Sequence, residues 1–178
     1  MPSTPDTQST RIELVPASPE QEPILANLLE FYIHDFSEFY PMDPGPDGRF
    51  GYPNLSAYWS HPDRYPFLIE AGGKLAGLVL VKKDRGVASV GPVWDIAEFF
   101  ILRAWRRKGI GTEAAHQAWE RFPGEWELRA MQSNRNAVEF WQRAIAGFTG
   151  AAIKPALLEK GGVIWQVFRF ESKPAAKE

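Results

Sequence analysis

An apolar run, a cluster of basic residues and a glycine pair meet in the stretch FFILRAWRRKGIGTEAAHQAW, which spans Phe99–Trp119. The apolar run ends at Leu102, and the glycines Gly109 and Gly111 then lead into a segment with helical spacing. A buried strand that passes through a glycine turn into a helix indicates a β-α-β crossover. We therefore expect the strand before this turn and the strand after the helix to run parallel, with the helix packed on the sheet.

The turn itself has the features of an anion site. A helix N-terminus carries unpaired N–H donors and a partial positive charge, and glycine lets a ligand approach those donors closely. Four basic residues surround it: Arg103, Arg106, Arg107 and Lys108. The combination favours a phosphate or a pyrophosphate as the ligand. A solvated basic loop with an ordinary glycine turn explains the spacing equally well.

Residue order excludes two common nucleotide-binding motifs at this turn. A P-loop places its lysine after the second glycine, whereas Lys108 precedes Gly109. The dinucleotide fingerprint requires a third glycine, which the segment GIGTEA lacks.

Hydrophobic periodicity along the rest of the chain predicts a mixed α/β domain, with a central sheet of about seven strands and flanking helices. Glycine pairs predict two hairpin turns, at Gly72–Gly73 and Gly161–Gly162. Strands are expected at 11–17, 65–71, 74–83, 91–102, 125–131, 151–159 and 163–171. Helices are expected from Ser18 to Ile33 or further, within 55–64, at 112–122, and at 136–145 with an end near Gly147.

Composition narrows the classes of function. The chain has 178 residues and a formal net charge of -2, so it offers one domain and no overall field for nucleic acid or a membrane. It contains no cysteine, which excludes disulfides, thiolate metal sites and cysteine nucleophiles. The three histidines, His34, His61 and His116, show no metal-ligand spacing, so no metal is expected. There is no basic stripe beyond 103–108 for a nucleic acid.

The N-terminus MPSTPDTQST lacks the apolar core of a signal peptide, and no apolar run approaches the ~20 residues of a membrane helix. A cytoplasmic protein is the expectation. We expect a disordered tail at 1–10, one domain at 11–171 and a loose tail at 172–178.

The segment RRKGIG (Arg106–Gly111) matches the Arg/Gln-x-x-Gly-x-Gly/Ala motif of the GNAT superfamily of N-acetyltransferases. The strand EFFIL resembles the family's fourth strand, which splays from the next one. The segment NRNAVEFW…GF (Asn134–Phe148) is similar to the family's Asn-x-x-Ala region. The element order agrees over 11–171, and the chain also resembles an uncharacterised subgroup of predicted acetyltransferases.

The resemblance implies acetyl-CoA as the cofactor. Backbone N–H groups of Arg107–Thr112 would bind its pyrophosphate, and the strand edge at Phe100–Leu102 would pair with its pantetheine arm. Asn134 would bind the pantetheine or simply cap the following helix. The residues so implied in cofactor binding are Phe100, Ile101, Leu102, Arg103, Arg106, Arg107, Lys108, Gly109, Ile110, Gly111, Thr112, Asn134 and Trp141.

The implied reaction is direct attack of a neutral primary amine on the thioester in a ternary complex. Glu98 is the expected base; the alternative is a strand glutamate that faces solvent or pairs with an arginine. Trp141 stands where the family has a tyrosine as general acid, and an indole has no proton that titrates near neutral pH. Another group, such as Tyr32 or Tyr40, would then serve, or the thiolate would leave unaided.

The acceptor site is expected in the segment YIHDFSEFYPMD, with Tyr32, Asp35 and Glu38 as substrate-binding residues. An acidic, aromatic-lined mouth would suit a cationic amine of a small molecule or peptide. Core packing for Tyr32 and a solvated helical face for the carboxylates are the alternatives. At the level of function, a non-catalytic acyl-CoA-binding sensor or interaction module is the second hypothesis, and a homodimer is left open.

Overall fold

The structure, a computed structural model, describes residues 10–173. The expected tails at 1–10 and 172–178 lie almost entirely outside these residues. Among the described residues, no helix is long and apolar enough to cross a membrane.

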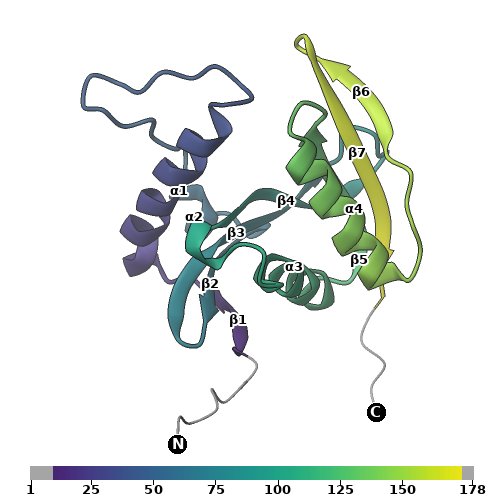
Figure 1. Ribbon diagram of the computed structural model, residues 1–178, viewed down its shortest axis with the longest axis horizontal. Coiled ribbons are helices and arrows are strands. Elements are labelled where there is room, and N and C mark those ends of the chain that lie inside the picture. The colour runs from purple at the N-terminus through teal and green to yellow at the C-terminus, as the bar shows by residue number, and fades with distance from the viewer. Residues whose placement is uncertain (1–9, 174–178) are drawn as a thin grey trace, which may run out of the picture.

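Within residues 10–173, seven strands and four α-helices follow the predicted order (Figure 1), and two 3-10 turns that were not predicted lie between them. The strands are β1 (Ile12–Pro16), β2 (Arg64–Ala71), β3 (Lys74–Arg85), β4 (Pro92–Ile101), β5 (Gly124–Met131), β6 (Ala156–Lys160) and β7 (Val163–Ser172). The α-helices are α1 (Glu22–Phe36), α2 (Ala57–Ser60), α3 (Ile110–Arg121) and α4 (Arg135–Thr149), and the 3-10 turns are η1 (Pro19–Gln21) and η2 (Arg103–Trp105).

The seven strands form one mixed sheet in the order β1-β2-β3-β4-β5-β7-β6. Neighbours pair antiparallel except β4 and β5, which run parallel as the crossover predicts. The β4–β5 ladder holds a single registered pair, Trp94 with Trp126, near the start of both strands. The C-terminal halves of these two strands therefore splay apart and leave a wedge in the middle of the sheet.

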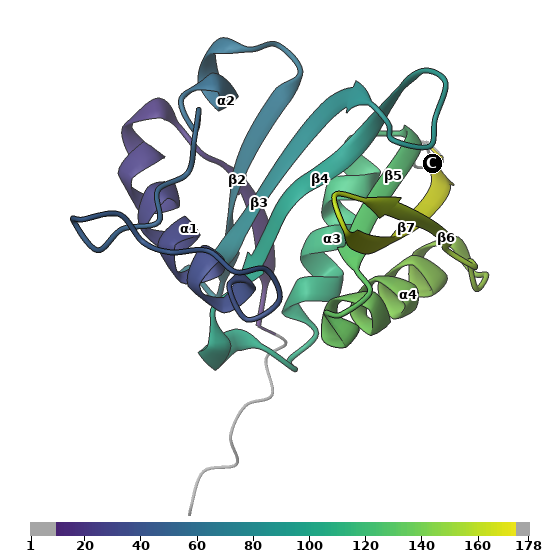
Figure 2. The ribbon, with the colours of Figure 1, turned by 90° about the horizontal axis from the view of Figure 1, so that it is seen from above.

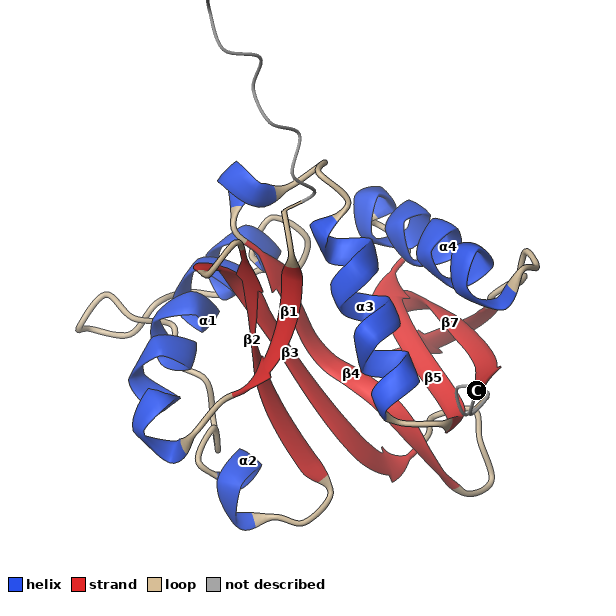
Figure 3. Ribbon diagram, turned by 90° about the horizontal axis from the view of Figure 1, so that it is seen from below, coloured by secondary structure: helices blue, strands red, loops and turns tan. Residues whose placement is uncertain are grey.

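The helices cover the two faces of the sheet separately (Figures 2 and 3). Helices α3 and α4 pack on one face over a core that includes Trp119, Trp126 and Phe168, all almost fully buried. Helices α1 and α2 pack on the other face, where Leu25 and Leu29 meet Leu78 and other residues of the second core. The wedge between β4 and β5 thus opens to both layers.

Two predicted helix boundaries are wrong. Helix α4 continues through Gly147 to Thr149 and ends at Gly150, whose φ of 75° is the left-handed conformation of a C-terminal cap. A Cβ on Gly147 would lie 3.7 Å from the ring of His116 in α3, so this glycine marks a helix–helix contact inside the helix. Helix α3 begins at Ile110 instead of residue 112, because Gly109 is its N-cap.

Candidate active site

The turn before α3 adopts the backbone conformation that exposes N–H groups. Arg107 and Gly109 both have positive φ, 60° and 78°, and for a non-glycine residue such as Arg107 this costs about 1–3 kcal/mol. Strained backbone conformations of this kind are frequent in ligand-binding loops. The N–H groups of Gly109–Thr112 precede the first helical hydrogen bond, which Glu113 N donates to the carbonyl of Gly109.

No side chain caps the N-terminus of α3. By contrast, the Oδ1 atom of Asn134 at the start of α4 accepts a hydrogen bond of 3.1 Å from Ala137 N. The helix-cap role considered for Asn134 is therefore present in the structure, while its contact with pantetheine stays a prediction. The two helices differ at this point: a side chain of α4 caps one of its own first-turn donors, whereas no side chain caps those of α3.

The two glycines of the motif have different tasks. A Cβ on Gly109 would meet no atom within 4 Å, so its requirement is the positive φ and the open space above the turn. A Cβ on Gly111 would lie 3.2 Å from the Phe140 ring, so its requirement is the close contact between α3 and α4. Arg107 and Lys108 remain exposed beside this turn, and neither makes an ion pair with the residues described.

The open edge of β4 follows from its hydrogen bonds to β3. Leu102 N donates to the carbonyl of Ala76 at 2.8 Å, and backbone groups alternate between the two edges of a strand. Leu102 and Phe100 therefore face β3, and Ile101 and Phe99 face the wedge. Of the three residues predicted to pair with pantetheine, only Ile101 turns its backbone to the open edge, and Phe99 joins it. The Ile101 carbonyl already accepts a 2.7 Å hydrogen bond from Arg106 Nε.

A β-bulge places Glu98 on the α1 face of the sheet. Leu80 pairs with Glu98 and Val81 pairs with Ile96, so Ala97 is the extra residue. Ile96 points into the core under α3 and α4, whereas Glu98 two residues later faces α1 and the loop after it. In an unbulged strand both side chains would share one face.

Two tyrosines surround the Glu98 carboxylate. The Tyr52 hydroxyl donates a 3.0 Å hydrogen bond to its Oε1 atom, and the phenol of Tyr32 on α1 also faces it. Burial raises the pKa of Glu98, and the contacts with Tyr32 and Tyr52 offset only part of this rise. Burial and the neighbouring carboxylate also raise the pKa of both phenols, which therefore remain hydrogen-bond donors at neutral pH. A partly buried carboxylate with a raised pKa is suited to accept a proton from an ammonium.

Asp35 is held by the two arginines of the turn. Its oxygens accept hydrogen bonds of 2.6 Å from Arg103 and 2.7 Å from Arg106. Burial acts to raise the pKa of Asp35, but these two hydrogen bonds outweigh it, and the pKa lies below its ordinary value. Arg103 and Arg106 thus join the turn to α1. Each of these three side chains therefore already has a protein partner. We predicted that Asp35 binds the acceptor and that the two arginines lie near the phosphates, and both roles stay predictions.

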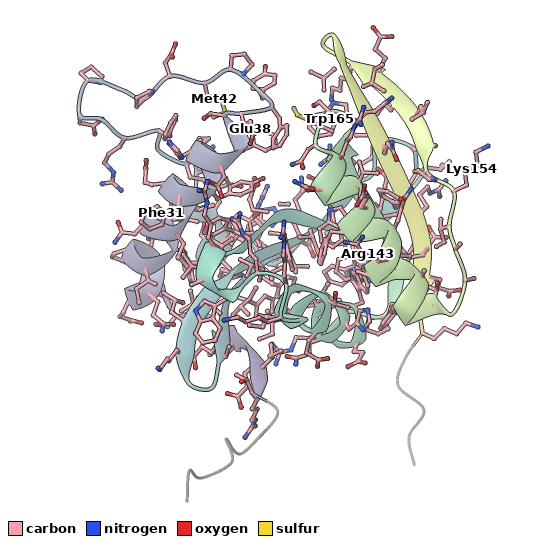
Figure 4. The ribbon with its side chains drawn as sticks, viewed as in Figure 1. Phe31, Glu38, Met42, Arg143, Lys154 and Trp165 are labelled. Atoms are coloured by element: carbon pink, nitrogen blue, oxygen red, sulfur yellow. The ribbon has the colours of Figure 1, made fainter. Side chains whose placement is uncertain are left out.

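A cavity of about 400 Å³ opens on the same face of the sheet, between the end of α1 and the β6–β7 hairpin. Its lining residues are Phe36, Tyr40, Met42, Val87, Arg129, Met131, Leu158, Lys160, Gly161, Val163 and Trp165. Figure 4 shows Glu38 and Met42 on the α1 side and Trp165 across from them on β7. The expected aromatic lining is present, but neither Asp35 nor Glu38 belongs to it, and its charged members are Arg129 and Lys160.

Trp141 is part of the core beneath the wedge. It is 7% exposed, and its ring centroid lies 5.1 Å from that of Phe99 and 4.8 Å from that of Phe140. Its predicted contact with the cofactor is untested. Of the tyrosines considered as a substitute for the missing acid, Tyr32 faces Glu98 and Tyr40 lines the cavity.

Sequence reasoning missed Phe99, Tyr52, Arg129 and Lys160. Strand alternation could have identified Phe99 once the pairing of Leu102 was known. Tyr52 lies in a turn-rich segment 46 residues from Glu98, and no local pattern joins the two. Arg129 and Lys160 come from two separate strands that meet at the cavity only in the folded sheet.

A seven-stranded mixed sheet that splays beside a glycine-capped helix defines the class of protein as an acetyltransferase fold. The chain belongs to the acetyltransferase (GNAT) family, whose model matches residues 25–148. Acetyl-CoA-dependent acetyl transfer is the activity that this membership implies, with acetyl-CoA as the cofactor. Comparison with curated proteins gives no match.

Solved structures agree on the fold. An acetyltransferase from Thermus thermophilus has a TM-score of 0.62 and 17% identity, with 90% of this chain and 96% of that chain covered. Arabidopsis thaliana NAA60 in complex with a bisubstrate analogue has a TM-score of 0.58 and 13% identity, covering 90% and 98%. Spermidine N-acetyltransferase from Vibrio cholerae, in complex with CoA and spermine, has a TM-score of 0.59 and 13% identity, covering 90% and 95%.

Proposed function

We propose that this protein transfers the acetyl group of acetyl-CoA to a primary amine of a small molecule or peptide. The observation that carries the proposal is the position of Glu98, on the bulge of β4 and between two phenols. It lies on the strand that borders the wedge, and that strand leads through η2 and the basic turn to the N-terminus of α3, which has no side-chain cap.

The residues of the turn fit the diphosphate of the cofactor. The N–H groups of Ile110–Thr112 would donate to its oxygens, and the side chains of Arg107 and Lys108 would add positive charge. The backbone of Phe99 and Ile101 would pair with the amides of the pantetheine arm along the open edge of β4. This arrangement would direct the thioester toward the bulge, where Glu98 lies.

Glu98 would then remove a proton from the acceptor ammonium, directly or through a water molecule. The neutral amine would attack the thioester carbonyl and form the C–N bond, and its nitrogen would lose a second proton to water. The C–S bond would then break and release the CoA thiolate. Backbone N–H groups beside the bulge would stabilise the oxyanion of the intermediate. Trp141 supplies no proton to the thiolate, so water or a free solvent acid would protonate it.

The buried indole of Trp141 also favours the second candidate, a protein that binds acyl-CoA without transferring it. Release of the CoA thiol, measured with a panel of amines, separates the two. We expect release with the wild type, and a rate lower by roughly 10²- to 10⁴-fold with Glu98→Gln. Glu125→Gln, which changes an exposed glutamate on β5, is the matched control. A protein that binds acetyl-CoA and releases no thiol with any amine would support the second candidate.

A further inference from the structure

We propose that the acceptor is a small amine with an apolar or aromatic body and a carboxylate, as in an aromatic or aliphatic α-amino acid, and not a polyamine. The inference rests on the proposed function, because it takes the cavity between α1 and the β6–β7 hairpin as the acceptor site. The lining of that cavity supports this acceptor. The lining is apolar and basic, whereas the sequence suggested an acidic mouth.

The walls of the cavity are mostly apolar. Eight of the eleven lining residues are aliphatic, aromatic or methionine side chains, and Phe36, Tyr40 and Trp165 contribute three rings. A volume of about 400 Å³ is at the small end of the range for small-molecule sites. Such a wall favours binding of a compact apolar group. It offers few hydrogen-bond acceptors to the ammonium groups of a polyamine.

The charged groups in the lining are both cations, Arg129 on β5 and Lys160 on β6. One nitrogen of Arg129 donates a 3.0 Å hydrogen bond to buried Asp95, and the guanidinium has further N–H donors to offer. Asp95 also lies 3.8 Å from Lys82 Nζ, so one carboxylate is shared by two cations. Lys160 makes no ion pair within residues 10–173.

Asp95 offsets part of the charge of Arg129 and Lys82, and the other acidic residues near the cavity have partners of their own. Asp35 forms ion pairs with Arg103 and Arg106. Glu38 does not line the cavity and interacts electrostatically with Arg103. Buried Glu127 accepts hydrogen bonds from Val87 N, Ala88 N and the Ser89 hydroxyl, so it faces the loop between β3 and β4. The lining therefore presents net positive charge to a ligand.

Glu98, the proposed base, does not line the cavity but is connected to it through α1. Tyr32, which faces Glu98, lies 5.9 Å from Phe36 between ring centroids, and Phe36 lines the cavity. The base and the cavity thus share one wall of α1. An α-amino acid would place its α-carbon between Glu98 and the two cations, with the ammonium toward Glu98 and the carboxylate toward Arg129 or Lys160. Its side chain would pack against the rings. Charge-assisted hydrogen bonds, such as those of a carboxylate to these cations, are the stronger ones in proteins.

Pairs of amines that differ only in the carboxylate test this directly. Phenylalanine, tyrosine, tryptophan and leucine are compared with phenethylamine, tyramine, tryptamine and isoamylamine, and spermidine is included as the polycation. We expect kcat/KM for CoA release to be at least about tenfold higher for the best amino acid than for its decarboxylated partner. Lys160→Gln should lower kcat/KM for the amino acid more than for its decarboxylated partner, mainly through KM, and so reduce that ratio. Lys154→Gln, an exposed lysine outside the cavity, is the control.

Equal or higher kcat/KM for spermidine or for the decarboxylated amines would overturn this inference and leave the proposed function intact. Calorimetry with CoA and N-acetylphenylalanine, against N-acetylphenethylamine, gives a readout that needs no turnover. Preferential binding of the carboxylate without any CoA release would support the specificity of the cavity and contradict catalysis. Equal binding of both compounds would contradict the inference even in an active enzyme.

Discussion

The hydroxyl of Tyr52 lies 3.0 Å from Oε1 of Glu98 and donates a hydrogen bond to it. This contact joins the loop between α1 and α2 to the bulge of β4. It orients the carboxylate, which the phenol of Tyr32 also faces. The same loop begins beside the cavity, so the geometry of the base and that of the acceptor site depend on one segment of chain.

The raised pKa of Glu98 predicts an acidic limb in the pH dependence of kcat/KM. The rate should rise with pH as Glu98 loses its proton, with a midpoint above the ordinary glutamate value because burial raises the pKa. Glu98→Gln should remove this limb along with most of the activity. A stopped assay of CoA release between pH 4 and pH 9 would measure it, and an unchanged profile in Glu98→Gln would exclude Glu98 as the base.

Replacement of Tyr52 by phenylalanine should move that limb to higher pH. The phenol lowers the pKa of Glu98 by donating a hydrogen bond to the charged form, so its loss lets burial raise the pKa further. Activity at high pH should be retained to a large extent, since the base itself is present. A midpoint that moves to lower pH, or does not move, would show that Tyr52 does not act on the carboxylate.

Glu98 also predicts a change in stability with pH. A carboxyl whose pKa is higher in the folded than in the unfolded protein binds more protons when folded. Its contribution to the free energy of unfolding is fully present below the unfolded pKa and is lost as pH rises through the folded pKa. Glu98→Gln lacks this loss, so its stability relative to the wild type should increase between about pH 4 and neutral pH. Urea unfolding at several pH values measures it, and a difference that stays constant would contradict the assignment.

The N-cap glycine of α3 predicts a specific loss of cofactor binding. Gly109→Trp would place a large side chain over the uncapped N–H groups and weaken CoA binding by at least about tenfold. Gly73→Trp is the matched control, because Gly73 has φ of 72° against 78° for Gly109 and also has open space around its Cβ position. The backbone strain is therefore similar, and only the ligand site differs. Equal CoA affinity of the two folded variants in calorimetry would refute the site.

Local patterns were sufficient for the order of the elements. Glycine pairs marked both hairpin turns, and strand alternation with helical spacing located the elements between them. Gly147 misled the prediction of α4 because a glycine at a helix–helix contact and a glycine at a helix end look alike in sequence.

The partners within the site were beyond the reach of such patterns. Asp35 meets Arg103 and Arg106 across 68 and 71 residues, and Tyr52 meets Glu98 across 46. The face on which Glu98 lies depends on a one-residue bulge at Ala97 that leaves no mark in the strand's composition. Contacts of this kind are set by tertiary packing, so the sequence suggested candidate residues and the structure showed which of them meet.

Titration of the ¹⁵N-labelled protein with acetyl-CoA tests the central claim most directly, because it follows individual backbone amides. We expect the amides of Ile110, Gly111 and Thr112 to show the largest shifts on binding, together with those of Phe99 and Ile101 on the open edge of β4. Saturable binding that leaves the three α3 amides unmoved, with the largest shifts elsewhere on the molecule, would contradict it.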